Sequence, residues 1–323
     1  VVAYHLDNLR FWLNMGVDGF RFDAVGVLFE NGPDAWKLQP ENHVLLHEAQ
    51  TLITAYGKRF MVCEAPDDPL AYAASTSCGR AFAFQVPGAI FSSVRSGSID
   101  AGVLAAIAAT DGERLAWILS NHDSFAGDRP WNQLNGDVEA YKLAAEIYLL
   151  ASRNPFAYYG EEVGMANAST LAGDHALRTP MSWTSNPVTA GFTTGTPFRD
   201  LSANVATNNV MDQAGIAGSL LEHYRGLYQL RAAYTVLGSG ATTVLSNAGE
   251  PVLLFRRDGA GEKAVVAVNV SGAAQNVTAE TGWADADFDG VYGAAGQVTS
   301  DAAGALAISV PARSTVVYRG VAP

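Results

Sequence analysis

Charge, cysteine and long apolar runs are all scarce in this 323-residue sequence. Charged residues make up only 16%, and 32 Asp and Glu against 20 Lys and Arg give a formal net charge of −12. Because no cluster of Lys and Arg offsets this acid, we expect neither nucleic acid nor an anionic membrane as a partner. No stretch approaches the roughly 20 apolar residues that span a bilayer. A neutral polymer such as a glycan would not be repelled.

The two cysteines, Cys63 and Cys78, lack the spacing of a metal site, and one pair neither requires nor excludes a disulfide. Hydrophobic residues, in contrast, make up 49%, which predicts a sizeable core. The length fits one large domain and a smaller one, because domains typically hold about 100–200 residues.

Helical and strand patterns alternate over the first half of the chain, which predicts right-handed crossovers and a parallel sheet. The expected helices are 3–15, 41–56, 99–109, 138–152 and, later, 219–233. The expected strands are 17–23, 59–64, 80–86, 115–120 and 155–159.

The pattern changes twice after this alternation. Residues 166–218 are rich in Gly, Thr, Asn and Pro and are expected to form long loops. From about residue 235 we expect short antiparallel strands and no helix, in a β-sandwich. The predicted domains are therefore 1–234, the helix and strand part, and 235–323, the β-sandwich.

Three of the expected strands end in a carboxylate, namely Asp23, Glu64 and Asp123. In a parallel α/β barrel the carboxyl ends of several strands supply the catalytic groups. The first two strands are consecutive, and neighbouring strands lie about 4.8 Å apart. Asp23 and Glu64 would then approach the roughly 5–5.5 Å that separates the two carboxyl groups of retaining glycosidases.

The surroundings of these two acids predict different roles. Arg21 lies two residues before Asp23 on the same face of its strand, so it would keep Asp23 ionised, as a nucleophile must be. Glu64 follows the apolar run 60–63, where desolvation would raise its pKa and suit a proton donor. The alternatives are a surface ion pair for Arg21 and Asp23, and a helix-capping role for Glu64.

Other polar and aromatic residues have two interpretations each. His122, next to Asp123, is either functional or a core histidine. Glu161 and Glu162 are either a second acidic pair or, as we favour, residues that hold the loop after the last parallel strand. Three aromatic residues could stack on sugar rings or pack in the core: Trp131, Trp183 and Phe192.

Taken together, the motifs resemble those of glycoside hydrolase family 13, the α-amylase family, over nearly the whole chain. The stretch GFRFDA (19–24) is similar to the family's nucleophile motif, CEA (63–65) to its acid/base motif, and SNHD (120–123) to the motif with the third aspartate. PFAYYGEEVGM (155–165) resembles the eighth strand and its loop. RTPMSW (178–183) and GFTTG (191–195) resemble the oligo-1,6-glucosidase and trehalose-synthase side of the family.

The resemblance implies a role for six residues. Asp23 would be the nucleophile, Glu64 the general acid/base, and Asp123 the residue that binds sugar hydroxyls and stabilises the transition state. Arg21 would orient Asp23, and His122 would hydrogen-bond the sugar. Arg129 would also reach the sugar, although it lies further from Asp123 than the family pattern leads us to expect.

Two departures from the family pattern stand out. Many α-amylases carry Lys-His shortly after the nucleophile, where this chain has Gly26 and Val27. The chain also begins inside the helix before the fourth strand, so the fold class expected is a (β/α)8 TIM barrel of which strands four to eight are present, followed by the β-sandwich. Five strands cannot close a barrel, so we expect the N-terminal half of the barrel in the full protein.

The predicted function is that of a retaining hydrolase of α-1,4-glucans or maltooligosaccharides, of the α-amylase type. An exo-acting α-glucosidase, an oligo-1,6-glucosidase or a glucosyltransferase of the same family is the alternative. A second alternative is a non-catalytic glucan-binding or partner-binding relative. A third is an unrelated barrel that binds a metal ion through its acids. The chemistry requires no cofactor, structural Ca²⁺ is compatible with the family, and a polymeric substrate suggests a secreted or periplasmic protein.

Overall fold

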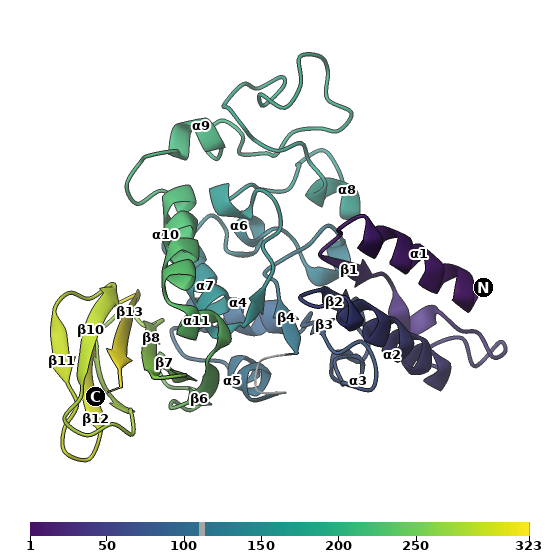
Figure 1. The fold of residues 1–323 in the computed structure, drawn as a ribbon. Coiled ribbons are helices and arrows are strands. Elements are labelled where there is room, and N and C mark those ends of the chain that lie inside the picture. The colour runs from purple at the N-terminus through teal and green to yellow at the C-terminus, as the bar shows by residue number, and fades with distance from the viewer. Residues whose placement is uncertain (110–113, 323) are drawn as a thin grey trace. The chain divides into compact units, whose positions relative to one another are not determined.

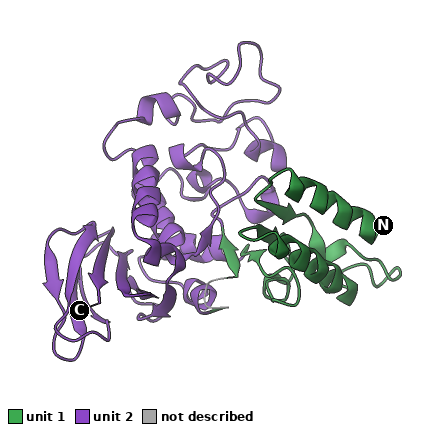
Figure 2. Cartoon of the chain, viewed as in Figure 1, with its two compact units in different colours: residues 1–84, 109–117 green, residues 85–108, 118–323 purple. Residues whose placement is uncertain are grey.

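The computed structural model describes residues 1–109 and 114–322, which are drawn in Figure 1. The chain divides into two compact units, coloured separately in Figure 2. The first unit is Val1–Phe84 with Ala109–Trp117, and the second is Gln85–Ala108 with Ile118–Pro323. Within the described residues, no helix is both long and apolar enough to cross a membrane.

The first unit is a short parallel sheet with helices packed beside it. Its strands, in spatial order, are β1 (Gly19–Phe22), β2 (Phe60–Cys63), β3 (Ala81–Phe82) and β4 (Leu115–Trp117). Its helices are α1 (Val2–Asn14), the 3₁₀ turn η1 (Val25–Val27), α2 (Pro40–Ala55) and α3 (Pro69–Tyr72). The prediction of parallel strands in this order is confirmed, although each strand is shorter than expected.

The helix α1 buries two leucines and ends just before a glycine that lets the chain turn into β1. Leu6 and Leu13 of α1 are buried, and the helix ends before Gly16, which adopts φ 96° and donates its N–H to the Leu13 carbonyl at 3.0 Å. A side chain at this left-handed φ would be strained, so glycine allows the chain to turn from the helix into the strand.

The second unit holds the remaining helices and a short strand. The helices are α4 (Val86–Ser96), α5 (Ala101–Ala108), α6 (Pro130–Gln133), α7 (Val138–Ala151), α8 (Asp174–Leu177), α9 (Val210–Gln213), α10 (Leu220–Ala233) and α11 (Thr235–Ser239), with the 3₁₀ turns η3 (Ser124–Ala126) and η4 (Glu161–Val163) and the strand β5 (Asn154–Pro155). The apolar helix α7 packs against α4 and α10. Side chains cap the N-termini of α7 and α10: Asp137 accepts from the Ala140 N–H and Ser219 from the Glu222 N–H.

Three predictions of secondary structure were wrong. The expected strand 155–159 overlaps the two-residue strand β5 at Pro155 alone. The expected strand 80–86 ends at Phe82, and Val86 begins α4, a helix whose buried face includes Ile90, Phe91 and Val94. Pro87 does not prevent this helix, because a proline is readily accepted in the first turn. The prediction of no helix beyond residue 235 is also wrong, because α11 occupies the start of that segment.

The C-terminal part forms two antiparallel sheets, as predicted. The larger has the order β11-β10-β13-β8-β7-β6 and the smaller pairs β12 with β9. Side chains from both sheets share one core, among them Phe288, Leu306 and Val316. The strands are β6 (Ala241–Val244), β7 (Val252–Gly259), β8 (Glu262–Asn269), β9 (Gln275–Glu280), β10 (Asp287–Tyr292), β11 (Gln297–Thr299), β12 (Ala305–Val310) and β13 (Ser314–Val321).

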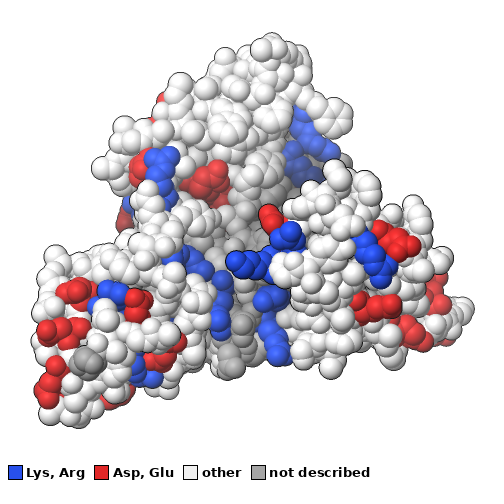
Figure 3. Space-filling view, in the orientation of Figure 1, with Lys and Arg blue, Asp and Glu red and all other residues white. Residues whose placement is uncertain are grey.

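Acidic and basic side chains alternate over these sheets on the face drawn in Figure 3. Asp258 of β7 accepts from Arg256 at 2.9 Å and lies 3.1 Å from the ammonium group of Lys263. Arg319 of β13 pairs with Glu262 of β8. These ion pairs offset part of the chain's excess negative charge within the C-terminal sheets.

A buried carboxyl group joins α7 to the larger sheet. Glu146 accepts hydrogen bonds from the hydroxyl groups of Thr315 in β13 at 2.6 Å and Tyr292 in β10 at 2.8 Å. The imidazole Nε2 of His223 in α10 lies 3.6 Å from the same carboxyl group. Burial raises the pKa of Glu146 to about 7, and burial lowers the pKa of His223 to about 4. Both groups are therefore more stable in their neutral forms in this packing.

Replacing Glu146 by Gln should remove a specific pH dependence of stability. With a pKa of about 7 in the fold and 4.5 as its ordinary value, the Glu146 carboxyl binds its proton more tightly in the folded protein. Its contribution to the free energy of unfolding is therefore present below pH 4.5 and is lost as the pH rises towards 7. Urea unfolding of Glu146→Gln and wild type should diverge across this window by roughly 3 kcal/mol in favour of the variant.

The matched control is Glu139→Gln, on the exposed side of the same helix. Because His223 is present in all three proteins, the opposite effect of its lowered pKa falls largely out of the comparison. Parallel pH curves for Glu146→Gln and wild type would contradict the prediction.

Candidate active site

The strand pairing places Asp23 and Glu64 at the same edge of the first sheet. In the register of β1 with β2, Phe22 is the partner of Cys63, and each acid is the next residue on its strand. The Glu64 N–H donates to the Phe22 carbonyl at 2.8 Å, and the Glu64 carbonyl accepts from the Val25 N–H at 3.1 Å. The main chain therefore fixes the two acids side by side.

One guanidinium group joins the two carboxyl groups. Arg21 donates from one terminal nitrogen to Asp23 Oδ1 at 2.6 Å and from the other to Glu64 Oε2. The sequence predicted the contact with Asp23 but not the contact with Glu64. The exposure of the two acids differs strongly, since the Asp23 side chain is 75% exposed and that of Glu64 only 8%.

This difference in environment affects the proton affinity of Glu64. Burial raises the pKa of Glu64 above its ordinary value of 4.5, and a hydrogen bond with the Asp23 carboxyl raises it further. The positive charge of Arg21 and the Ala24 N–H lower the pKa and offset part of the increase. The prediction that desolvation raises the pKa of Glu64 is therefore confirmed in direction, and a proton is held on the buried acid more readily than on an ordinary glutamate.

The residue after Asp23 has a strained backbone. Ala24 adopts φ 45° and ψ 43°, in the left-handed region that non-glycine residues rarely occupy. In this conformation the Ala24 N–H points at Glu64 Oε2, at 3.4 Å. Strain of this kind concentrates at functional sites, where the surrounding structure maintains it.

The second unit contains a separate cluster around Asp123. The Asp123 carboxyl, 18% exposed, accepts from Arg178 at 2.7 Å and lies 3.2 Å from His122 Nε2. Arg178 also donates to the His122 carbonyl at 2.8 Å and pairs with Asp174 at 3.1 Å. The predicted pair His122 and Asp123 is therefore held by an arginine from the loop after α8.

Arg178 has no role that the sequence alone predicted, although it lies in one of the motifs that carry the resemblance. It is 55 residues from Asp123, and only the fold brings the two together. One local signal existed, namely Asp174 four residues before it, which accepts from the Ser124 N–H and hydroxyl at 2.8 Å. These two hydrogen bonds lower the pKa of Asp174.

Arg129 is buried within the second unit. Its guanidinium donates to the main-chain carbonyls of Tyr159 at 2.8 Å and Leu177 at 2.7 Å, and it lies over the rings of Tyr158 and Tyr159. These contacts fix the loop after β5. Its predicted binding to a sugar stays a prediction.

The buried Glu161 has the loop-holding position that the sequence favoured. Its carboxyl accepts from the hydroxyl groups of Tyr148 at 2.6 Å and Tyr224 at 2.9 Å, and burial raises its pKa to about 7. These hydrogen bonds tie the turn η4 to α7 and α10.

Several exposed aromatic side chains lie near Arg178. Phe192 and Phe198 line a cavity of about 350 Å³ whose wall includes Arg178 and Tyr159. Trp183 is exposed as well, so neither it nor Phe192 packs in the core, whereas Trp131 is half-buried. Aromatic faces beside polar groups are typical of pockets for small polar ligands.

The described residues contain no group of three His, Cys, Asp or Glu side chains that could hold a metal ion. The acids at the strand ends are instead paired with Arg21 and Arg178. Structural calcium stays a prediction.

Comparison with known proteins gives a consistent family. The family profile "Alpha amylase, catalytic domain" matches residues 1–240. Trehalose synthase/amylase TreS of Mycolicibacterium smegmatis is 28% identical in an alignment of 319 positions, gaps included, that covers 82% of this chain and 54% of that protein. Oligo-1,6-glucosidase of Heyndrickxia coagulans is 25% identical in an alignment of 334 positions, gaps included, that covers 82% of this chain and 60% of that protein. The chain thus spans little more than half the length of these curated relatives.

A solved structure, the α-amylase from H. orenii, superposes with a TM-score of 0.75 over 99% of this chain and 64% of that one, at 22% identity. This likeness supports the fold, a TIM barrel with a C-terminal β-domain. The residues described here contain a parallel sheet and antiparallel sheets but no complete barrel. Since the profile matches well over half of its residues, the chain belongs to glycoside hydrolase family 13, the α-amylase family.

Proposed function

We propose that this chain carries the catalytic carboxylates of a retaining α-glucoside hydrolase. The observation that supports it most strongly is the single guanidinium of Arg21 shared by Asp23 and Glu64. The two carboxyl groups share this guanidinium and also hydrogen-bond each other, which leaves no space between them for the water molecule of an inverting enzyme, whose carboxyl groups lie about 6.5–9.5 Å apart. The short separation fits a nucleophile and a proton donor.

The reaction would proceed by double displacement. Glu64 donates its proton to the glycosidic oxygen while the Asp23 carboxylate attacks the anomeric carbon, so the glycosidic bond breaks and a glucosyl ester forms on Asp23. Glu64, now ionised, takes a proton from water, and the resulting hydroxide attacks the anomeric carbon and releases the sugar from Asp23. The Arg21 charge would favour the ionised form of Asp23.

In the same proposal the second cluster binds the sugar. Asp123 and His122 would hydrogen-bond hydroxyl groups of the ring, and Arg178 would orient both through its contacts with the Asp123 carboxyl and the His122 carbonyl. A carboxylate that accepts from a sugar hydroxyl can strengthen that hydrogen bond as positive charge develops on the ring. No organic cofactor takes part in these steps.

For the substrate we propose α-1,4-glucans and maltooligosaccharides. Glucosyl transfer between sugars is the second candidate, because five similar relatives are trehalose synthases, three of them described as trehalose synthase/amylase. Gly26 and Val27 provide no charged contact beyond the cleaved bond. Both candidates share the glucosyl intermediate and differ in whether water or a sugar hydroxyl accepts the glucosyl group.

The proposal extends to the whole protein. A barrel of this family needs strands that the described residues do not contain, so we propose that an N-terminal half completes it. The disulfide Cys63–Cys78 supports a protein made in an oxidising compartment, which favours a secreted or periplasmic location.

The variant Asp23→Asn should lose at least about 10³-fold in kcat on maltooligosaccharides, because an amide cannot form the glucosyl ester. Glu64→Gln should lose roughly 10²–10⁴-fold. The matched control is Asp18→Asn, an exposed acid just before β1 that pairs with Arg59 at 3.4 Å. Equal activity of Asp23→Asn and wild type would refute the assignment and favour a non-catalytic relative.

A product profile on maltoheptaose separates the substrate candidates. We expect a mixture of short maltooligosaccharides from cleavage within the chain, with all new reducing ends accounted for by water. Release of glucose alone from one end would contradict the amylase type. Trehalose formed from maltose, or products longer than the substrate, would favour glucosyl transfer.

A further inference from the structure

The strand β2, which precedes the candidate proton donor Glu64, ends at a cysteine that forms a disulfide. Cys63, the last residue of β2 and the neighbour of Glu64, is bonded to Cys78, with the two Cα atoms 6.2 Å apart. Both cysteines are buried. The bond closes the segment 64–78, which begins with the candidate acid/base itself.

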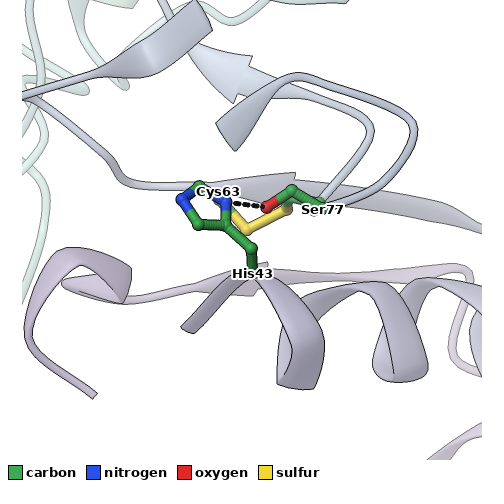
Figure 4. The surroundings of a disulfide bond; sticks show 4 residues. His43, Cys63 and Ser77 are labelled. Atoms are coloured by element: carbon green, nitrogen blue, oxygen red, sulfur yellow. Dashed lines mark hydrogen bonds between the residues drawn. A yellow bond between two sulfur atoms is a disulfide. The ribbon is translucent and has the colours of Figure 1, made fainter. Parts of the chain in front are cut away.

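The closed segment is docked on α2 next to the disulfide, as Figure 4 shows. Ser77 hydrogen-bonds His43 Nδ1 of α2 at 2.9 Å, and the His43 ring stacks on Tyr72 of α3 at 4.3 Å between ring centres. Tyr72 in turn accepts from the Asn42 side chain at 3.2 Å. The segment is therefore anchored at both the disulfide and α2.

The end of β2 is paired over more residues with β1 than with β3. Towards β1, four residue pairs are in register, and Glu64 itself donates to Phe22. Towards β3, only Cys63 and Ala81 are in register, and the Cys63 N–H donates to the Arg80 carbonyl at 3.0 Å. The disulfide lies on this weakly paired side, one residue from Glu64.

We propose that the Cys63–Cys78 disulfide positions the proton donor, because it fixes the end of β2 and closes the segment that starts at Glu64, which is buried beside Arg21 and Asp23. This inference rests on the proposed function for the role of Glu64. It assigns to the disulfide a catalytic consequence in addition to the stability that a closed loop provides.

A positioning role predicts a loss that depends on the leaving group. Maltotriose needs a proton on its departing hydroxyl, whereas the dinitrophenolate of 2,4-dinitrophenyl α-glucoside leaves without one, so only the first substrate depends fully on Glu64. In the intact protein, Cys63→Ala/Cys78→Ala should lose about tenfold or more in kcat/KM on maltotriose, through kcat and with KM little changed. The kcat/KM of the aryl glucoside should be nearly unaffected, because it reports formation of the glucosyl ester and not the later hydrolysis, in which Glu64 activates water.

The pH profile gives a second readout. Greater exposure of Glu64 would return its pKa towards the ordinary value, so the basic limb of kcat/KM should move to lower pH in the double variant. The matched control is Ser77→Ala, which removes the hydrogen bond to His43 and keeps the disulfide. Equal losses on both substrates, an unmoved basic limb, or the same losses in Ser77→Ala would overturn the inference.

Two further measurements keep the outcome decisive. Wild type treated with dithiothreitol should behave like the double variant. In this reduction two thiols of the reagent are oxidised while the disulfide gains two electrons and two protons. Unfolding of both proteins at the assay temperature would show that the disulfide stabilises the whole fold, and would overturn the inference. Hydrogen exchange at the Glu64 amide should rise when the disulfide is lost. Inactive oxidised wild type would refute the proposed function alone, and an amide that stays protected would overturn the inference whatever the activity.

Discussion

The candidate site depends on one guanidinium between two carboxyl groups. Parallel pairing brings Phe22 opposite Cys63, and the next residue on each strand is an acid. Two carboxylates this close repel each other, so at least one positive charge or one proton must lie with them. Arg21 provides the charge to both, and the burial of Glu64 favours the proton on that residue. The asymmetry between an exposed and a buried acid is what allows one to attack and the other to donate.

The surrounding structure maintains this arrangement at several points. The left-handed Ala24 aims its N–H at Glu64, and the disulfide holds the other side of β2. In the second unit Arg178 serves Asp123 in a comparable way, since one guanidinium fixes the carboxyl group and the neighbouring carbonyl. In both clusters the guanidinium group of an arginine hydrogen-bonds the carboxylate and sets its orientation, which is a common way to preorganise charge for catalysis.

Local pattern was sufficient to predict much of this. The apolar runs that end in Asp23 and Glu64 predicted two neighbouring parallel strands with an acid after each, because a buried parallel strand is apolar along its length. Glu64 lies among apolar neighbours in the sequence, so its raised pKa could be predicted. Short strands rich in Val between Gly and Asn turns likewise predicted the C-terminal sheets.

Features that depend on contacts across the fold could not be predicted in this way. Val86-Pro87-Gly88 looks like the end of a strand, yet it begins α4, because the apolar residues that follow at helical spacing bury one face of the helix. Arg178 reaches Asp123 across 55 residues, and Cys63 pairs with Cys78 only because the segment between them folds back on α2. The polar strands β9 and β11 are paired by their neighbours and carry little signal of their own.

The most direct test is to trap the covalent intermediate. The intact Glu64→Gln variant, in which hydrolysis of the ester is slowed, would be incubated with a fluorinated α-glucosyl fluoride, whose leaving group needs no proton, and then digested at low pH for mass spectrometry. We expect one glucosyl adduct, on the peptide that contains Asp23, and none in Asp23→Asn. An adduct on Asp123, or turnover of wild type without any adduct on Asp23, would contradict the roles assigned to the two acids.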